Sequence, residues 1–489
     1  MTASAPVPDP RRWRALSVML MGQFAALLDV SVTNVALPSI GRSTGAGASE
    51  LQWIVTGYVL AFALVPVIGG RLGDQHGRRR IFVIAVLGFV IASAAVGLAP
   101  NAGLLIAARV VQGLFGGMMG PQVSGFIQNA FPAWERGRAF GRLGLTVGAG
   151  TALGPVIAGV LIAAGGPEIG WRLVFFINVP VGIAAVLLAR RVVPPDEPSS
   201  PASGRRVDVL GAVLLGAGVL CLLFPIVETG QSGGPLTLLL LLPAAGFLVA
   251  LVRHEARLTK ADAGPLLDLR LFRVRSFVTG VVFAVVFFCS NTGIPLVLAL
   301  YYQNGLGFTA LQSGLGVTAY AIGSVVGAPL AGRFVSRVGR PLLVGAVAVF
   351  TSVTIVLGLL VQVGAEATDP AGVILRLCVP LFVLGIAGGA IVTPNQTLTL
   401  ADVDPRRGGV AGGVVQTAQR VGSSIGQTVL GTAFVLAVAG AAGSASAGSP
   451  AGDPAIFADA LTLALAVSVV FSGSAILLSA IEVRRHRNG

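Results

Sequence analysis

The chain has few charged residues for its length. Only 11% of its 489 residues are Asp, Glu, Lys or Arg, whereas 54% are hydrophobic. A soluble globular protein normally carries about 25% charged residues. The mean hydropathy of +0.87 reflects long apolar stretches that are separated by short arginine-rich loops. These features exclude an ordinary soluble protein and predict a polytopic membrane protein. The apolar stretches lack the alternating ten-residue pattern of a β-barrel, so the spans are expected to be helices.

The residue types that carry enzyme or metal chemistry are also scarce. The three cysteines, Cys221, Cys289 and Cys378, each lie within an apolar stretch, and their spacing indicates neither a disulfide framework nor a metal site. There is no Cys/His cluster, paired-carboxylate site or motif nucleophile. The glycine-rich run "GLFGGMMG" has no preceding strand, and a Walker motif is absent, so ATP is not the expected energy source. We therefore expect no enzyme activity, no metal and no cofactor.

A spanning helix needs roughly 20 apolar residues. That rule predicts fourteen spans and an all-α fold, and no signal peptide is evident before the first span. The spans are expected to begin near residues 15, 51, 81, 103, 139, 172, 208, 236, 276, 309, 341, 371, 409 and 458.

The positive charges fall in alternate loops, which explains the net charge of +13. Arginines precede the first span and follow the last one, and most of the others lie in the loops on the same side. The opposite loops hold Arg42 as their only cation, with several acids. The positive-inside rule therefore places both termini in the cytoplasm and the chain in the cell (inner or plasma) membrane. A nucleic-acid partner is not expected, because no basic loop is long enough to form a soluble domain, and no obligate protein partner is evident.

The sequence repeats itself weakly. "GRLGDQHGR" from Gly70 resembles "GRFVSRVGR" from Gly332, and "GTALG" from Gly150 resembles "GSSIG" from Gly422. Two parallel six-helix repeats with a binding site at the membrane midplane form a transporter arrangement in which one half rocks against the other. The predicted parts are an N-terminal bundle (1–191), a cytoplasmic linker (192–207), an inserted helix pair (208–254), a cytoplasmic loop (255–275) and a C-terminal bundle (276–489).

Several motifs follow one another in the first half. They are "LLDVSVTNVALPSI", "GGRLGDQHGRRR", "LIAARVVQGLFGG", "GAGTALGPVIAG" and "GWRLVFFINVPVG". Together with the number of spans, this set resembles the major facilitator superfamily, and in particular its fourteen-helix drug:proton antiporter branch. The resemblance covers essentially the whole chain. One departure is Ala158, where the family's motif usually has a second glycine next to Gly159.

Asp29 is the one acid well within a predicted span. It lies about 14 residues, or about 21 Å, into a helix that enters from the cytoplasm. Arg109 lies about 6 residues, or about 9 Å, into a helix that enters from outside. In a hydrocarbon core about 30 Å thick the two are at a similar level, so they could interact. An ionisable residue inside the membrane indicates a functional site. The resemblance implies that the acid carries the proton and that the arginine takes part in coupling; the alternative is a static ion pair.

The short loop after the second span combines glycines, an acid and arginines. Gly70, Asp74, Gly77, Arg78 and Arg79 match the family's gate motif, which implies a charge relay that holds the cytoplasmic gate closed. In the second repeat the position of Asp74 is occupied by Ser336, so one half alone carries the acid. The alternative is a solvated loop that only obeys the positive-inside rule.

The fifth span contains Gly150, Gly154, Pro155 and Gly159. Proline lacks a backbone N–H, and the glycines leave one helix face bare. The resemblance implies a bend and a tight, dry interface with the thirteenth span that opposes leakage in exporters. Ordinary packing of small residues is the alternative.

Substrate contacts are expected from uncharged polar and aromatic residues, although each of these is more often a helix–helix hydrogen bond. Arg420 is deep for a lone cation and could line the cavity or be structural, whereas Arg376 is expected to snorkel and Arg172 to be structural. Glu228 lies at the outer end of the inserted pair. The candidates are Asn34, Gln52, Tyr58, Gln122, Asn291, Tyr320, Gln396 and Arg420.

The resemblance and these residues predict a proton-coupled antiporter that exports small lipophilic or cationic drugs or antibiotics from the cytoplasm by alternating access. The proton gradient would supply the energy. A dedicated exporter of one endogenous metabolite or self-made antibiotic is the main alternative, followed by a uniporter or importer of the same fold. A channel is disfavoured by the two-half repeat and the gate motif.

Overall fold

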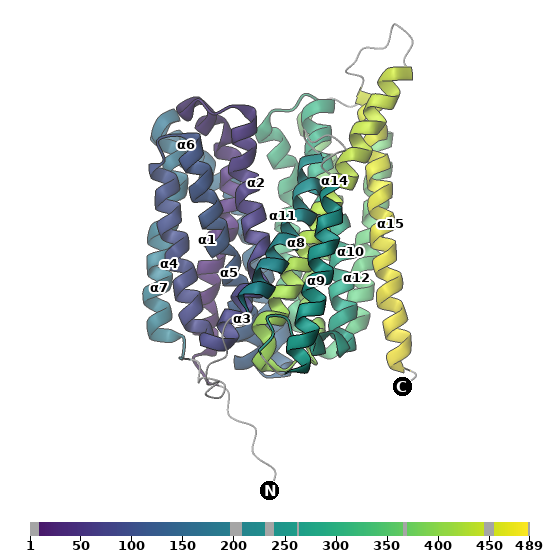
Figure 1. Ribbon diagram of the computed structural model, residues 1–489. Helices are drawn as coiled ribbons and strands as arrows, with labels where there is room; N and C mark the ends of the chain where they lie inside the picture. Colours follow the sequence, from purple (N-terminus) through teal and green to yellow (C-terminus); the bar gives the residue numbers. More distant parts are fainter. Residues whose placement is uncertain are drawn as a thin grey trace. The chain divides into compact units, whose positions relative to one another are not determined.

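The computed structural model describes residues 9–195, 208–229, 239–261, 264–364, 369–444 and 454–487, and every regular element in these ranges is helical (Figure 1). Three elements are short: η2 (Leu269–Arg273), η3 (Tyr301–Gly305) and η4 (Pro405–Arg407). The long helices are α1 (Arg12–Thr44), α2 (Ala48–Leu64), α3 (Pro66–His76), α4 (Arg78–Leu98), α5 (Ala102–Ala130), α6 (Ala133–Phe176), α7 (Asn178–Val192), α8 (Val209–Thr229), α9 (Leu241–Lys260), α10 (Arg275–Leu300), α11 (Ala310–Val338), α12 (Arg340–Val363), α13 (Pro370–Thr399), α14 (Gly408–Ser444) and α15 (Pro454–Arg487).

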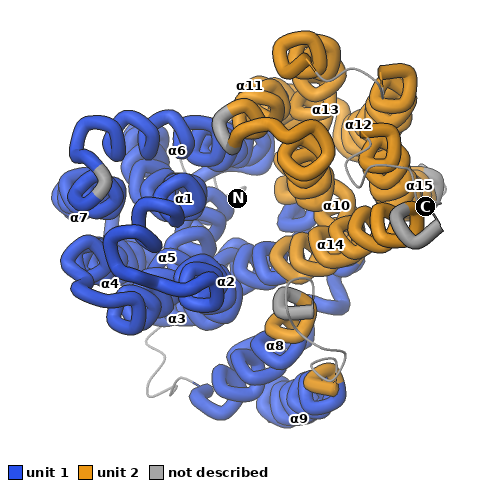
Figure 2. Tube along the Cα trace, turned by 90° about the horizontal axis from the view of Figure 1, so that it is seen from above, with its two compact units in different colours: residues 1–222, 242–278, 399–417 blue, residues 223–241, 279–398, 418–489 orange. Residues whose placement is uncertain are grey.

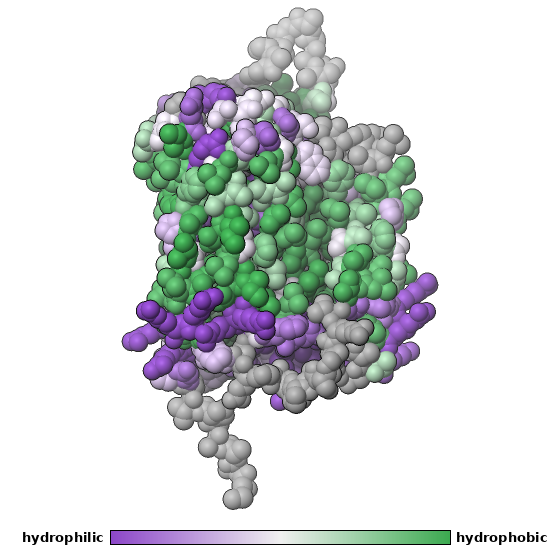
Figure 3. All heavy atoms as spheres, turned by 60° about the vertical axis from the view of Figure 1, so that its left-hand side comes forward, coloured by the Kyte–Doolittle hydropathy of each residue, from purple (hydrophilic) through white to green (hydrophobic). Residues whose placement is uncertain are grey.

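Most of these helices are long and apolar enough to cross a membrane. Among the described residues twelve meet that test, and there are thirteen if α2 and α3, which are bent by 44° at Val65, are counted together as one span. The long α6 takes part in two of the spans, because its backbone breaks at Gly166, where φ is +71°. The first span is Ala133–Gly166, and the second, Glu168–Val192, combines the end of α6 with α7. An apolar band with hydrophilic side chains gathered below it covers the face in Figure 3. The prediction of an all-α polytopic membrane protein is therefore confirmed.

The eighth predicted span corresponds to α9, which does not meet the same test. The last two turns of this helix carry Arg253, His254, Glu255 and Arg257, which lower its hydropathy. The residues just before it, 230–238, lie outside the described part of the chain, as does most of the predicted linker. With α9 included, helices are present at all fourteen predicted places.

The helices form two compact units (Figure 2). Unit 1 consists of Met1–Leu222, Leu242–Val278 and Thr399–Thr417. Unit 2 consists of Leu223–Leu241, Thr279–Leu398 and Ala418–Gly489. The first turns of α14 therefore belong to the same unit as α1 to α7, whereas the rest of α14 belongs to the other unit. This division places the start of α14 beside the motif loop that follows α3.

Within unit 1, α6 packs closely on α1 through glycines. A Cβ atom at Gly150 would lie 3.1 Å from the Cβ of Leu27, and one at Gly154 would lie 2.3 Å from the Cβ of Ser31. Small residues let helix backbones approach in this way, and the close approach supplies van der Waals contact in lipid. The glycines of α6 therefore fix the helix that carries Asp29.

Unit 2 uses the same packing between α14 and α10. A Cβ at Gly422 would lie 2.3 Å from the backbone oxygen of Val285, and one at Gly426 would lie 2.0 Å from that of Cys289. The register of the repeat follows from these contacts: Ser31 corresponds to Cys289, so Asp29 corresponds to Phe287.

Phe287 occupies an apolar environment. It is 1% exposed, and its ring centroid lies 5.9 Å from that of Phe283 and 5.3 Å from that of Phe350. The repeat therefore has a carboxylate in one unit and an aromatic core at the matching place in the other. At this position of the repeat, the buried carboxylate therefore lies in unit 1 and has no counterpart at Phe287 of unit 2.

Candidate functional site

Asp29 is buried completely in unit 1 and accepts hydrogen bonds from three side chains. Arg109 of α5 donates from Nη1 to Asp29 Oδ2 and forms an ion pair with it. Gln112 Nε2 donates to Asp29 Oδ1 over 2.9 Å, and Asn178 Nδ2 donates to the same oxygen over 2.8 Å. The carboxylate and guanidinium are 0% and 1% exposed, so the pair has little access to water in this conformation.

Ser93 of α4 joins the two amides into one network. Gln112 and Asn178 each donate to the hydroxyl oxygen of Ser93 over 3.0 Å, and that hydroxyl donates to the backbone oxygen of Phe175 over 3.0 Å. Because Ser93, Gln112 and Asn178 come from α4, α5 and α7, three helices orient the donors around one acid of α1. Buried polar networks of this kind are rigid when their groups are satisfied.

A second set of contacts orients Arg109. Its Nε donates to the backbone oxygen of Ile54 in α2 over 3.2 Å. Its guanidinium carbon lies 4.1 Å from the ring centroid of Tyr58, a distance that gives a cation–π interaction. Tyr58 is anchored in turn, because its hydroxyl donates to the backbone oxygen of Ala26 over 3.0 Å. Tyr58, predicted as a substrate contact, thus belongs to the ion-pair network.

The arrangement holds a buried ion pair whose two members depend on each other. A charged Asp29 is stabilised by Arg109 and by two amide donors, whereas a protonated Asp29 would leave the guanidinium without its counter-ion. Removing one partner of a buried pair costs roughly 3–5 kcal/mol, because an uncompensated charge remains.

The motif loop after α3 forms a second polar site. Gly77 has φ +94°, in the region that favours glycine, and this residue links α3 to α4. The turn brings Arg78 over Asp74: Arg78 Nη2 donates to Asp74 Oδ1 over 2.9 Å and to the backbone oxygen of Pro405 over 2.9 Å. The neighbouring Arg79 donates to the backbone oxygen of Arg190, at the end of α7, over 2.6 Å.

The same carboxylate binds the beginning of α14. The backbone N–H of Gly409 donates to Asp74 Oδ1 over 3.2 Å, and that of Val410 donates to Oδ2 over 3.0 Å. The N-terminus of a helix favours an anion, because its first N–H groups lack partners inside the helix. A Cβ at Gly70 would lie 2.3 Å from the backbone oxygen of Gly409, so glycine at position 70 allows this approach. The predicted motif residues therefore lie together at a contact between α3, α4 and α14 inside unit 1.

The glycine motif of α6 is divided between two faces. Gly150 and Gly154 face α1, whereas Pro155 is exposed, and a Cβ at Gly159 would meet nothing within 4 Å. Ala158 is 0% exposed and belongs to a cluster with Val32 and other residues of unit 1. The predicted contact of this motif with the thirteenth span stays a prediction, because the described contacts of Gly150 and Gly154 are with α1.

The other predicted substrate contacts are spread over both units. In unit 1, Gln122 is buried and donates to the backbone oxygen of Gly69 over 2.7 Å. Asn34 is exposed at the protein surface, and Gln52 is half-buried. In unit 2, the hydroxyl of Tyr320 donates to Asn291 Oδ1 over 2.6 Å. Gln396 is buried and Arg420 is half-buried. The structure joins Tyr320 with Asn291 in unit 2 and Tyr58 with the ion pair in unit 1.

Two further arginines bind helix ends. Arg172 Nη1 donates to the backbone oxygens of Gly97 and Ala99, at the end of α4, over 2.8 and 2.9 Å. Arg376 Nη2 donates to the backbone oxygen of Gly364, just after α12, over 3.2 Å. These are structural contacts with carbonyl groups that have no partner inside their own helices. The side chain of Glu228 lies outside the described part of the chain.

Sequence reasoning missed Gln112, Asn178, Ser93 and the first residues of α14. The position of Gln112, three residues after Arg109, places both side chains on one helix face and could have suggested a shared site. Asn178 lies within the motif "WRLVFFINVP", which carried the resemblance without a role for this residue. Gly409 is separated from Asp74 by 335 residues, and no local pattern connects the two.

Comparison with known proteins gives a consistent result. Residues 19–427 match the family model described as Major Facilitator Superfamily. The chain is 38% identical over 424 residues to a probable actinorhodin transporter of Streptomyces coelicolor, covering 86% of this chain and 72% of that protein. It is 35% identical to a tetracenomycin C resistance and export protein of Streptomyces glaucescens, covering 85% and 74%. It is 33% identical to a puromycin resistance protein of Streptomyces alboniger, covering 86% and 82%.

Solved structures show the same fold at low identity. The human organic anion transporter MFSD10 matches with a TM-score of 0.62 and 16% identity, covering 95% of this chain and 100% of that one. The proton:xylose symporter XylE matches with a TM-score of 0.58 and 17% identity, covering 94% and 95%. The resemblance stated from the motifs is therefore confirmed.

Proposed function

Because the chain belongs to the major facilitator superfamily and to its drug-efflux branch, we propose that it exports small lipophilic or cationic compounds in exchange for protons. The protein is a multi-pass membrane transporter and not an enzyme. The observation that carries the proposal is the completely buried Asp29, bound by Arg109, Gln112 and Asn178. An acid of this kind costs stability in a membrane, and proton coupling gives it a function.

In this mechanism Asp29 and Arg109 act as a switch. A proton from the outer side neutralises Asp29 and releases Arg109 from its counter-ion. The uncompensated guanidinium then favours the conformation in which it finds a new partner, and the return of the proton to the cytoplasm restores the pair. Gln112 and Asn178 act as positioning residues, since they favour the charged carboxylate through their amide donors.

The contact of Asp74 with Arg78 and α14 acts as the cytoplasmic gate. Asp74 binds Arg78 and the first turn of α14 at once, so its hydrogen bonds favour the conformation that is closed on this side. They are made and broken as access alternates. The proposed location of this gate in the cytoplasm is supported by the distribution of arginine between loops, because the positive-inside rule favours cytoplasmic termini and the cell membrane.

The named relatives favour antibiotics as the substrate class. One relative is a probable actinorhodin transporter, a second is a tetracenomycin C resistance and export protein, and a third is a puromycin resistance protein. A dedicated exporter of one self-made antibiotic is therefore the second candidate function. A panel of compounds separates the two candidates, because a dedicated exporter transports one scaffold and a drug exporter transports several unrelated ones.

The proposal is tested by the variant Asp29→Asn in inverted membrane vesicles with a proton gradient. The amide removes the proton site and keeps the size of the side chain. Gradient-driven transport of a fluorescent cation or an antibiotic is expected to fall to background, while substrate binding persists. The matched control is Asp402→Asn, which removes an exposed carboxylate and is expected to retain transport. Undiminished gradient-driven transport by Asp29→Asn would contradict proton coupling at this residue and would favour a uniporter.

A further inference from the structure

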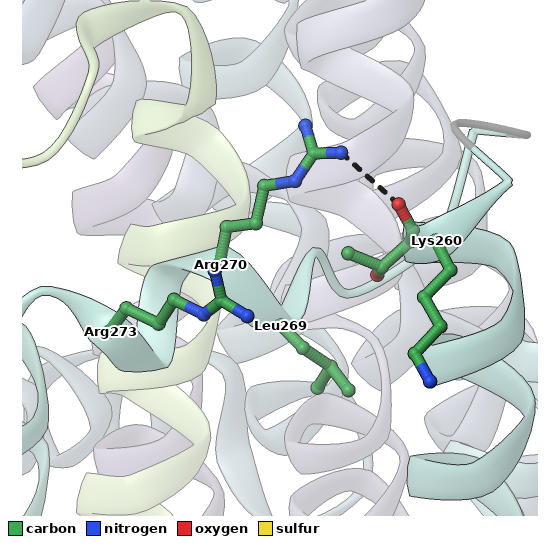
Figure 4. A pocket seen from close by; sticks show the side chains of 5 residues that line it. Lys260, Leu269, Arg270 and Arg273 are labelled. Atoms are coloured by element: carbon green, nitrogen blue, oxygen red, sulfur yellow. Dashed lines mark hydrogen bonds between the residues drawn. The ribbon is translucent and has the colours of Figure 1, made fainter.

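The segment from the end of α9 to the start of α10 is unusually basic. It holds the only lysine of the chain, and its cations are Arg253, Arg257, Lys260, Arg270, Arg273 and Arg275. A hollow of about 230 Å³ lies between α9 and η2 (Figure 4), and its lining residues are Thr259, Lys260, Leu269, Arg270 and Arg273. Among the described residues, the lining therefore combines three cations, a hydroxyl and an apolar side chain.

The two acids of this segment that the structure describes, Glu255 and Asp268, are not among the residues that line the hollow. Glu255 is 0% exposed, on the inner side of α9. Asp268 pairs with Arg407 over 2.7 Å and accepts a hydrogen bond from the backbone N–H of Arg270 over 2.9 Å. Within the described part of the chain no ion pair involves Lys260 or Arg273. Both side chains are exposed at the hollow.

Arg270 is fixed at the hollow. Its Nη2 donates to the backbone oxygen of Thr259 over 3.1 Å, a bond that is visible in Figure 4. A guanidinium has five N–H donors in a planar fork that matches the oxygens of a phosphate. The hollow thus has a positioned arginine together with Lys260 and Arg273.

The outer face of α9 continues from this basic end into an apolar stripe. Leu242, Val249, Arg253 and Lys260 are spaced by seven, four and seven residues, which places them on one side of the helix. Leu242 is 72% exposed and Val249 is 50% exposed, whereas Leu251, on the other side, is 3% exposed. This side of α9 is therefore apolar for several turns and basic at its end. Such a face complements an anionic phospholipid, which has apolar acyl chains and a charged headgroup.

We propose that the hollow binds the phosphate headgroup of an anionic phospholipid, with the acyl chains lying along Leu242 and Val249 of α9. Clusters of four to eight Lys or Arg next to a membrane span, and basic pockets between spans, attract anionic headgroups. The proposed topology places this end of α9 at the cytoplasmic leaflet. The site is separate from Asp29 and Asp74, and lipid binding requires neither proton coupling nor a particular substrate.

The test is native mass spectrometry of the full-length protein in a neutral detergent. Phosphatidylglycerol, phosphatidylcholine or inorganic phosphate is added in separate samples. The wild type is expected to retain phosphatidylglycerol and to show little phosphatidylcholine under the same conditions. The double variant Lys260→Ala/Arg273→Ala is expected to retain about tenfold less phosphatidylglycerol, because each cation near the headgroup contributes to the attraction.

Two matched variants separate the hollow from general surface charge. Lys260→Arg/Arg273→Lys keeps both charges and is expected to bind the anionic lipid as the wild type does, which also controls for folding. Arg11→Ala/Arg14→Ala removes two exposed cations elsewhere in unit 1 and is expected to leave lipid retention unchanged. Equal loss in this control pair, or equal retention of the two lipids by the wild type, would overturn the proposal.

The phosphate sample distinguishes a lipid from a soluble anion. Inorganic phosphate is expected to displace phosphatidylglycerol only weakly, since it cannot use the apolar stripe of α9. Displacement by phosphate at equal concentration would contradict the lipid assignment and would indicate a soluble-phosphate site. Because the measurement is of binding, its failure is independent of the outcome of the Asp29→Asn transport assay.

Discussion

Asn178, the first residue of α7, donates a hydrogen bond of 2.8 Å to Asp29 Oδ1, although 149 residues separate the two. An amide at this place supplies one of the donors that hold the carboxylate. We expect Asn178→Leu, which removes this donor, to lower gradient-driven transport by about tenfold or more, since a hydrogen bond to a charged group contributes roughly 1.5–3 kcal/mol. The control is Asn129→Leu at the exposed end of α5, which should retain transport. Transport of wild-type size in Asn178→Leu would exclude a role in positioning the acid.

The bonds from Gly409 and Val410 to Asp74 predict a local change in hydrogen exchange. Asp74→Asn removes the charge that the N-terminus of α14 favours, an interaction of about 0.3–2 kcal/mol. The amides of Gly409 and Val410 should therefore exchange severalfold to about tenfold faster, and transport should decrease. Asp369 provides the control, because it accepts a bond of 2.7 Å from the N–H of Gly372 at the start of α13. Asp369→Asn should accelerate exchange at Gly372 alone; unchanged exchange at Gly409 in Asp74→Asn would contradict the gate contact.

Glu255 predicts a dependence of stability on pH. Burial raises the pKa of this carboxyl from 4.5 to about 7, with a smaller raising effect from Asp208, and the backbone N–H of Leu267, His254 and Arg71 oppose the shift. Between pH 4.5 and about 7 the folded protein binds a proton that the unfolded chain has released, so stability decreases as pH rises through this window.

The variant Glu255→Gln removes that titration. Its melting temperature at pH 8 should exceed that of the wild type by roughly 2–4 °C, and the difference should shrink at pH 5. Glu50→Gln, at the start of α2, is the comparison, because its carboxyl is exposed and caps the N–H of Gly47. A difference in melting temperature that is the same at both pH values would show that Glu255 does not titrate in this range.

The glycines of α6 predict opposite effects of one added methyl group. Gly154→Ala would place its Cβ 2.3 Å from the Cβ of Ser31, so α1 and α6 would have to separate. Overpacking of this kind typically costs 1–3 kcal/mol, and about that loss of stability is expected. Gly159→Ala meets nothing within 4 Å and should be neutral or slightly stabilising, since alanine favours a helix. Equal thermal stability of the two variants would show that α1 and α6 do not depend on the close approach at Gly154.

The sequence predicts the helices and the buried charges well, because both signals are local. A hydrophobic run identifies a span wherever it lies, and Asp29 and Arg109 are conspicuous as ions inside such runs. The eighth predicted span shows where hydropathy becomes insufficient. The corresponding helix α9 is apolar only in its first turns, so the hydropathy of its described residues does not distinguish a membrane span from a surface helix.

The partners of these charges could not be predicted from local patterns. Glutamine and asparagine in membrane helices often make ordinary hydrogen bonds between helices. The role of Gln112 and Asn178 can therefore be recognised only from the structure, in which both donate to Asp29. The glycine motif of α6 shows the same limit. Helical periodicity indicates a small face, but the identity of the partner helix, here α1 for Gly154, depends on tertiary packing.

The central claim is that Asp29 carries the transported proton. Its most direct test is proton movement driven by substrate in proteoliposomes with a pH-sensitive dye inside and no imposed gradient. A substrate gradient is expected to drive protons in the opposite direction through the wild type. Asp29→Asn is expected to abolish this flux while downhill substrate movement or exchange continues. Proton movement of wild-type size in Asp29→Asn, with substrate flux intact, would show that Asp29 does not carry the proton.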